Sequence, residues 1–220
     1  FTYLKASCTL FVQINLSPSF FGKPVPSNIV NYENEDVRNQ FAEIFEWTDE
    51  SKRAWKENAK NLLENYFSAF NYKCYSQKCE CPDGVKVKVS VSLGGGSPIH
   101  VYKPAVPQEA CNNPRAAGCY DPATDTIIVP SDTAFIDSRE FDGVTYNHST
   151  LVHEVGHSLG LSHPGQALNP PAPPNTSADY DADPSSIMGR GWILHKDDFQ
   201  KAFCSQLPSK GAGAGPWTAR

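Results

Sequence analysis

The chain contains no long apolar run and no excess of basic residues. Nowhere in its 220 residues is there an apolar stretch of the roughly 18 to 20 residues that a membrane-spanning helix needs. Its 19 lysines and arginines are outnumbered by 24 aspartates and glutamates, which gives a formal net charge of −5. This mild acidity argues against a nucleic-acid-binding surface and against a polybasic membrane patch. We therefore expect neither a membrane span nor a nucleic-acid partner.

Cysteine is present in an odd number. Seven cysteines in one chain indicate an oxidising environment, and the odd count leaves at least one thiol unpaired. Cys111 and Cys119 bracket a short loop and are the pair that a local disulfide joins most readily. A second zinc site at the cluster of Cys74, Cys79 and Cys81 is the alternative, but its C-x4-C-x-C spacing differs from that of paired C-x2-C zinc knuckles, which favours disulfides. The remaining cysteines are Cys8, Cys74, Cys79, Cys81 and Cys204.

Length and patterning predict one α+β domain. Hydrophobic residues make up 40% of the chain and aromatic residues 11%, which suffices for a single core. Apolar residues at every second position predict strands over 10–16 and 85–93, and Gly94 to Gly96 are expected to end the second of them. An apolar stripe at helical spacing, preceded by the capping residue Thr48, predicts a long packing helix that reaches Phe70. Further elements are expected as short strands over 99–102 and 126–129 and a short helix over 194–207.

A histidine-rich motif, HEVGHSLGLSH, runs from His153 to His163. His153 and His157 are one helical turn apart, so on an α-helix their imidazoles lie on one face and can bind the same divalent metal. Gly160 lets the chain leave the helix through a backbone conformation that a Cβ would disfavour, and His163 can then return to that metal. Three histidine ligands leave the fourth position of a tetrahedral zinc ion open for water, which is typical of catalytic zinc sites.

Glu154 lies beside the predicted ligands and is the candidate general base. Zinc lowers the pKa of its bound water to roughly 7, and Glu154 can take the proton as the water attacks a carbonyl group. The same carboxylate can return the proton to the departing amine, so one residue serves both halves of peptide hydrolysis. A polar surface helix with scattered histidines is the alternative, and the added Gly160 and His163 at fixed spacing argue against it.

The motif resembles that of the metzincin zinc endopeptidases, HExxHxxGxxH, which is followed by a methionine-containing turn. Ser186, Ile187 and Met188 lie downstream at a metzincin-like distance, and Met188 is the only methionine of the chain. The resemblance implies that Met188 packs beneath the zinc site, whereas a core-filling role is the alternative. The letters GLSHPG around His163 are most similar to the serralysin group. Arg190 stands where serralysin-like turns carry a tyrosine, and the calcium repeats of that group do not follow.

The resemblance also implies an architecture. We expect a twisted mixed sheet with a long packing helix and a zinc-binding helix, then a smaller irregular C-terminal subdomain that ends in a helix. The N-terminal subdomain is expected over 1–163, the C-terminal subdomain over 164–209 and a flexible tail over 210–220. The family places the sheet edge that borders the cleft just before the zinc helix, so Ile127 and Ile128 are candidates for a rim that binds extended substrates.

Several polar residues lie near the motif without matching its spacing. Asp179, Asp181 and Asp183 alternate along the chain and can either bind calcium or form a solvated turn. His148 and His195 are expected to be capping or surface groups and not zinc ligands. The predicted metal ligands therefore remain the three histidines of the motif.

These observations predict a zinc-dependent endopeptidase that acts on protein or peptide substrates as an exported monomer. A protease toxin domain released from a larger delivered protein is an alternative, since Phe1 is not an initiator residue and the chain is therefore expected to have been processed or cut from something longer. A non-catalytic module that binds zinc or peptides is a further alternative. The intact Glu154 argues against that module, because a purely binding site needs no base beside the metal.

Overall fold

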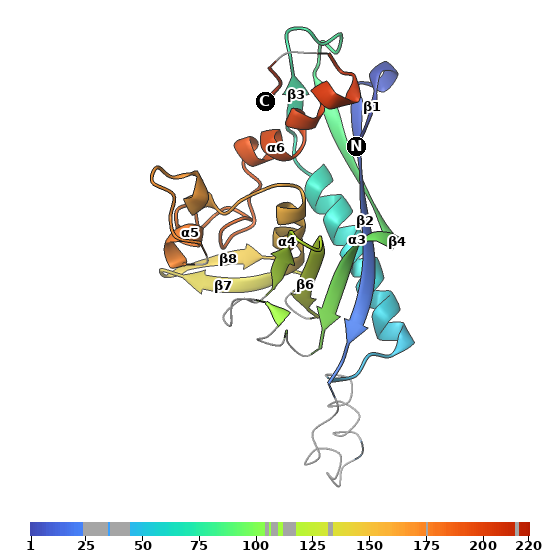
Figure 1. Ribbon diagram of the computed structural model, residues 1–220, viewed down its shortest axis with the longest axis vertical. Coiled ribbons are helices and arrows are strands. Elements are labelled where there is room, and N and C mark those ends of the chain that lie inside the picture. Colours follow the sequence, from blue (N-terminus) through green and yellow to red (C-terminus); the bar gives the residue numbers. More distant parts are fainter. Residues whose placement is uncertain are drawn as a thin grey trace.

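A twisted mixed sheet forms one side of the molecule, and the helices form the opposite side of the molecule (Figure 1). The protein is described here from a computed structural model. The residues that this structure describes are 1–23, 35, 45–103, 106, 110–111, 118–131, 134–174, 176–213 and 216–220. Together they have the mixed α+β architecture that the sequence predicts.

Two long parallel strands, β2 (Thr9–Phe21) and β4 (Val85–Tyr102), form the centre of the seven-stranded sheet. The alternating residues of β2 are buried as predicted, with Leu10, Val12 and Leu16 at most 1% exposed. Because successive side chains of a strand alternate between its two faces, these three lie on the same face of the sheet. This is the face against which the helices pack.

Shorter strands extend the sheet on both sides of this pair. β1 (Thr2–Leu4) runs antiparallel to β2 at one edge. On the other side of β4, β3 (Lys73–Tyr75) pairs with the start of the strand and β6 (Thr126–Pro130) with its end. Beyond these two lie β9 (Thr218–Ala219), antiparallel to β3, and β5 (Cys119–Asp121), antiparallel to β6.

The glycine run Gly94 to Gly96 does not end the second predicted strand, and this prediction was wrong. β4 continues to Tyr102, and its pairing with β2 shifts between Asn15 and Leu16 so that residues 93–96 bulge out of the ladder. Gly96 has φ +109°, and a Cβ there would lie 2.3 Å from the Asn15 carbonyl oxygen. Glycine at this position therefore permits a bulge within one strand where the sequence indicated a boundary.

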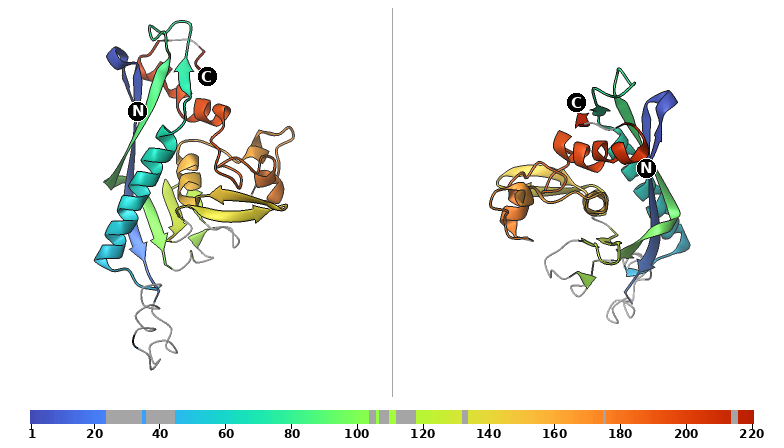
Figure 2. Two further views of the ribbon diagram at one scale, coloured as in Figure 1. Left: turned by 180° about the vertical axis from the view of Figure 1, so that it is seen from behind. Right: turned by 45° about the horizontal axis from the view of Figure 1, so that its top comes forward.

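The predicted long helix is α3 (Asp49–Ser68), which lies along the helical side of β2 and β4 (Figures 1 and 2). It begins at Thr48, whose hydroxyl accepts a hydrogen bond from the Ser51 amide at 3.1 Å. Its apolar stripe buries Trp55, Ala59 and Phe67, among others. The role of α3 as packing helix is thus the one expected.

The second half of the chain is less regular. A hairpin of β7 (Asp137–Phe141) and β8 (Val144–His148) leads into α4 (Thr150–Ser158), which carries the first part of the histidine motif. The short helices α5 (Ser177–Asp181) and α6 (Lys196–Ala202) follow. Single 3-10 turns occupy Lys5–Ser7, Pro164–Ala167, Cys204–Gln206 and Pro208–Lys210.

Two expectations for the end of the chain need correction. The helix expected over 194–207 ends at Ala202, although Phe199 and Phe203 are buried as predicted. The segment 210–220 does not end as a flexible tail, because β9 pairs with β3 and Trp217 is buried. Burial of the large apolar side chain of Trp217 stabilises the attachment of this segment to the sheet, which the glycine- and alanine-rich sequence before it does not indicate.

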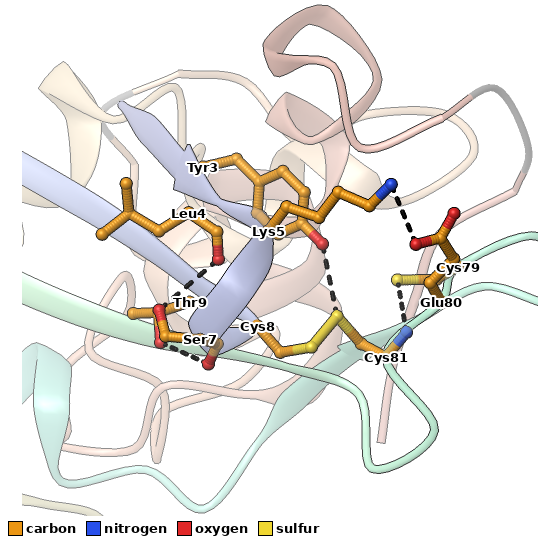
Figure 3. The surroundings of a disulfide bond; sticks show 9 residues. All are labelled: Tyr3, Leu4, Lys5, Ser7, Cys8, Thr9, Cys79, Glu80 and Cys81. Carbon is orange, nitrogen blue, oxygen red and sulfur yellow. Dashed lines mark hydrogen bonds and ion pairs between the residues drawn. A yellow bond between two sulfur atoms is a disulfide. The ribbon is translucent and has the colours of Figure 1, made fainter.

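The described chain contains three disulfides: Cys8–Cys81, Cys74–Cys204 and Cys111–Cys119. The first two join parts of the chain that are far apart in sequence. The local Cys111–Cys119 pair was predicted, and Cys79 is the free thiol that an odd count requires. Figure 3 shows the first bridge, with the Cys79 sulfur beside the Cys81 amide and the Lys5–Glu80 ion pair nearby. Because Cys74 and Cys81 are both oxidised, this cluster does not form the second zinc site considered above. No helix within the described ranges is long and apolar enough to cross a membrane.

Candidate metal centre

The helix α4 begins and ends at residues that fix its position. Its N-cap Ser149 accepts a hydrogen bond from the Val152 amide at 3.1 Å and donates one to the Ala134 carbonyl at 2.6 Å. At the other end Gly160 adopts φ +86°, and the Leu161 amide donates to the Gly156 carbonyl at 3.0 Å. This is a Schellman-type end, in which glycine takes the left-handed conformation and turns the chain back across the helix.

The turn after α4 brings the three predicted ligands together. The Nε2 atom of His163 lies 3.1 Å from Nε2 of His153 and 3.0 Å from Nε2 of His157. Within the described part of the chain, these three residues form the one group of histidine, cysteine or carboxylate side chains whose geometry can hold a metal ion. The structure thus assembles the ligand set that the motif predicts.

The Nδ1 atoms show which nitrogen of each ring carries the proton. Nδ1 of His153 donates to the Ile187 carbonyl at 2.7 Å, and Nδ1 of His157 donates to the Leu161 carbonyl at 3.0 Å. Nδ1 of His163 donates to the Asp179 carboxylate at 2.6 Å. In the neutral imidazole the other nitrogen then carries a lone pair, so the converging Nε2 atoms do not hydrogen-bond to one another.

Three lone pairs that face one point are the arrangement that a shared cation requires. Zinc–nitrogen bonds of about 2.0–2.1 Å in a tetrahedron separate the donor nitrogens by roughly 3.3–3.4 Å. The two observed separations, 3.0 and 3.1 Å, are close to that spacing. The donor set therefore fits a divalent metal with an affinity for imidazole, and every ligand has an acceptor that fixes its ring.

Asp179 is part of this centre, which sequence reasoning did not foresee. Its side chain is fully buried, and besides His163 it accepts a hydrogen bond from Gln166 at 2.5 Å. The neighbouring carboxylates have other partners, since Asp181 pairs with Arg190 and Asp183 pairs with His195 at 2.9 Å. The three alternating aspartates are therefore occupied by three separate protein partners and do not converge on one calcium site.

Burial determines the protonation of the centre. Burial, followed by the charge of neighbouring His157, holds the pKa of His153 well below its usual range. Burial likewise lowers the pKa of His157 to about 4, with a smaller contribution from His163. Both imidazoles are thus neutral at pH 7, which is the form that binds a metal. Burial also raises the pKa of the Glu154 carboxyl to about 8, and a cation held by the three histidines would lower it and so favour the carboxylate that a base requires.

Glu154 lies at the base of a cavity of about 840 Å³. Its side chain is mostly buried, yet the carboxylate has no hydrogen-bond partner among the described residues. Gly118 lies beside the carboxylate, and a Cβ there would come within 2.5 Å of the Thr150 side chain, so this wall of the site requires glycine. The candidate base is therefore available to a molecule that enters the cavity.

The edge strand beside the cavity is β5, so the prediction that residues 126–129 form the edge was wrong, although Ile128 does line the cavity. β6 lies between β4 and β5, and Ile127 is completely buried. Ile128 lines the cavity from this inner position, while Cys119, Tyr120 and Asp121 of β5 line it from the edge of the sheet. β5 pairs antiparallel with the outer side of β6 and has only three residues, which is too short to give a periodic signal in the sequence.

Met188 packs beneath the metal centre. It is completely buried, and its sulfur would lie 2.6 Å from a Cβ added at Gly156 of α4. The preceding residue, Ile187, supplies the carbonyl that orients His153. His148 is buried as well, with Nδ1 3.3 Å from the Gly191 carbonyl, so its prediction as a cap or surface group was wrong. The turn that contains Met188 therefore supports the centre through backbone groups and close packing.

Tyr180 completes the wall of the cavity on the side of α5. Its ring lies 4.2 Å from the His163 ring and 6.2 Å from the His153 ring, measured between centroids. Burial, followed by the charge of Glu154, raises the pKa of its phenol to about 12. No pattern in the sequence marked this residue, because it belongs to a five-residue helix between two irregular segments.

Comparison of the chain with protein-family models, with curated proteins and with solved structures found no match. Conclusions about the site therefore depend on its own geometry and chemistry.

Proposed function

We propose that the protein is a zinc-dependent endopeptidase of metzincin type. The observation that carries this proposal is the combination, in one open cavity, of three oriented imidazoles with a Glu154 carboxylate that no described residue pairs with. A site that only binds metal has no use for a buried carboxylate without a partner, because such a group costs desolvation free energy. A hydrolytic site does use it, as a proton acceptor.

His153, His157 and His163 would hold the zinc ion through Nε2. When bound, zinc polarises the carbonyl group of the substrate and makes water more acidic. Glu154 accepts a proton from the attacking water and delivers it to the amine nitrogen of the leaving group. Asp179, Ile187 and Leu161 keep the three imidazole rings in place during this exchange. Ion removal by a chelator is expected to abolish activity without breaking the disulfides.

The substrate is proposed to be an extended polypeptide. Among the described residues β5 pairs with β6 and with no other strand, so its other side can offer backbone N–H and C=O groups to a peptide that adds to the sheet. The cavity is lined both by this strand and by Glu154, so a backbone carbonyl of such a peptide would lie near the proposed metal. Binding through the main chain suits an enzyme that accepts many protein sequences.

The three disulfides support the proposal that the protein works outside reducing compartments, because structural disulfides form and persist in exported proteins. The same physical argument holds for an exported protease and for a protease domain released from a larger protein.

Replacing Glu154 with Gln tests the proposed reaction. The amide keeps the size of the side chain but cannot accept the proton, so we expect kcat/KM on casein to fall by about 10²- to 10⁴-fold while zinc content is unchanged. Glu57→Gln is the matched control, since Glu57 is exposed on α3. A Glu154→Gln protein that holds zinc and cleaves casein at the wild-type rate would exclude the proposed mechanism.

A further inference from the structure

We propose that the hydroxyl group of Tyr180 is a catalytic hydrogen-bond donor, which stabilises the negative charge that develops on the substrate carbonyl oxygen. This inference rests on the proposed function and assigns a role in it to a residue outside the histidine motif. It starts from a polar group in the cavity that has no hydrogen-bond partner among the described residues.

The position of Tyr180 is set by contacts on two sides. Its ring packs against the ring of His163 with centroids 4.2 Å apart, and Cζ of the Arg190 guanidinium lies 6.0 Å from the centroid of the Tyr180 ring. Arg190 also pairs with Asp181, the next residue of α5. The phenol ring is therefore held between the metal centre and the turn that follows Met188.

The hydroxyl group itself has no hydrogen-bond partner among the described residues, and it is not sealed from solvent. The side chain is half-buried, so its hydroxyl can meet a molecule that enters the cavity from solvent. Tyr180 lines the same cavity as Glu154, so a substrate in this cavity can supply the missing acceptor. A phenol keeps its proton at neutral pH and is then a hydrogen-bond donor.

The chemistry of amide hydrolysis defines what this donor does. The water oxygen forms a bond to the carbonyl carbon, and one of its protons passes to the Glu154 carboxylate. The electron pair of the C=O double bond moves to the carbonyl oxygen, which becomes negatively charged and accepts a hydrogen bond from Tyr180. When the C–N bond breaks, that electron pair re-forms the C=O bond and the amine takes the proton from Glu154. Tyr180 keeps its own proton throughout.

Such a hydrogen-bond donor stabilises the negatively charged tetrahedral adduct more than it stabilises the neutral substrate. Loss of one donor of this kind lowers kcat by about 10²- to 10³-fold in other acyl-transfer enzymes. Because the ground-state carbonyl oxygen is a weaker acceptor, KM changes little. The expected signature is therefore a loss in kcat together with weaker binding of tetrahedral anionic inhibitors.

The experiment compares zinc-loaded wild type with Tyr180→Phe, which keeps the ring against His163 and removes only the hydroxyl. The probes are a peptide that the wild type cleaves in a library digest and the phosphinic analogue of that peptide, in which a tetrahedral anion replaces the scissile amide. We expect kcat to fall by about 10²-fold with KM within about twofold, and the affinity for the phosphinic analogue to fall by a similar factor. Zinc content is expected to be unchanged. Tyr72→Phe is the control, because Tyr72 packs against Phe199 outside the cavity.

The outcomes separate this proposal from the proposed function. Unchanged kcat and phosphinate affinity in Tyr180→Phe, with Glu154→Gln inactive, would overturn the role of Tyr180 and leave the endopeptidase standing. Loss of zinc in Tyr180→Phe would also overturn it, since the residue would then act only through His163. If neither wild type nor variant cleaves any peptide, the endopeptidase proposal fails, and the role of Tyr180, which rests on it, fails with it.

Discussion

At the scale of single residues, the centre is organised by groups that do not touch the metal position. Each ligand ring is fixed by one acceptor at Nδ1, and two of these acceptors are backbone carbonyls that no substitution removes. The third is the Asp179 carboxylate, which is buried and ionic. Asp179 is therefore the one orienting group of the three that mutation can test directly.

Asp179→Asn is expected to weaken zinc binding by about 10- to 100-fold. The amide oxygen of Asn can still accept from His163, but it lacks the charge that raises the basicity of the ring, and its NH2 group opposes the donor Gln166. Titration with a competing chelator measures the affinity. Asp183→Asn is the matched control, because Asp183 pairs with His195 and Ser185 and contacts no ligand. Equal affinities in Asp179→Asn and wild type would contradict an orienting role.

At the scale of elements, α4 and the turn around Met188 fit together closely. Gly156 lies within the helix, where Ala would normally be favoured by up to about 1 kcal/mol. The Met188 sulfur occupies the space that a Cβ would take, and Leu161 lies nearby on the same side. Helix propensity thus favours alanine at this position, whereas the packing of the Met188 side chain favours glycine.

Gly156→Ala is expected to lower the free energy of unfolding by about 1–3 kcal/mol despite its higher helix propensity. Urea unfolding of the zinc-loaded protein measures this loss. Met188→Val in the same background shortens the opposing side chain, so it should restore part of the stability that Gly156→Ala removes. A stabilised Gly156→Ala variant, or additive effects of the two substitutions, would show that the helix and the turn are not in close contact here.

The sequence predicts those elements whose signal is local. Alternation in β2, the apolar stripe and cap of α3, and the spacing of the three histidines are each contained within one element, and the structure has all of them. The edge position of β5, the buried partner Asp179 and the wall residue Tyr180 depend on contacts between segments far apart in sequence. Such contacts are decided by tertiary packing, for which short strands and five-residue helices carry no periodic signal.

At the scale of the whole molecule, the disulfides connect the sheet to the C-terminal segment. Cys74–Cys204 closes a sequence separation of 130 residues, whereas Cys111–Cys119 closes a separation of 8. In the chain-entropy description a longer loop restricts the unfolded chain more, which gives about 5 kcal/mol for the long loop and about 2–3 kcal/mol for the short one. The long bridge is therefore expected to contribute more to stability.

Two double variants test this ranking. Cys74→Ser with Cys204→Ser is expected to lose more unfolding free energy than Cys111→Ser with Cys119→Ser, by about 2 kcal/mol. Urea unfolding provides the free energies, and labelling of the unreduced wild type should find one free thiol, at Cys79. A larger loss from the short bridge, or seven reactive thiols in oxidised protein, would contradict the stabilising role described here.

The connectivity of two bridges also determines how the chain would carry mechanical tension. The shortest covalent route between the two ends runs from Phe1 to Cys8, across to Cys81, back along the chain to Cys74, and across to Cys204. Residues 9–73 and 82–203 lie off this route, and the second range contains the whole metal centre. While both bridges are intact, a force that pulls on the two ends is borne by the covalent route, and the centre remains unloaded.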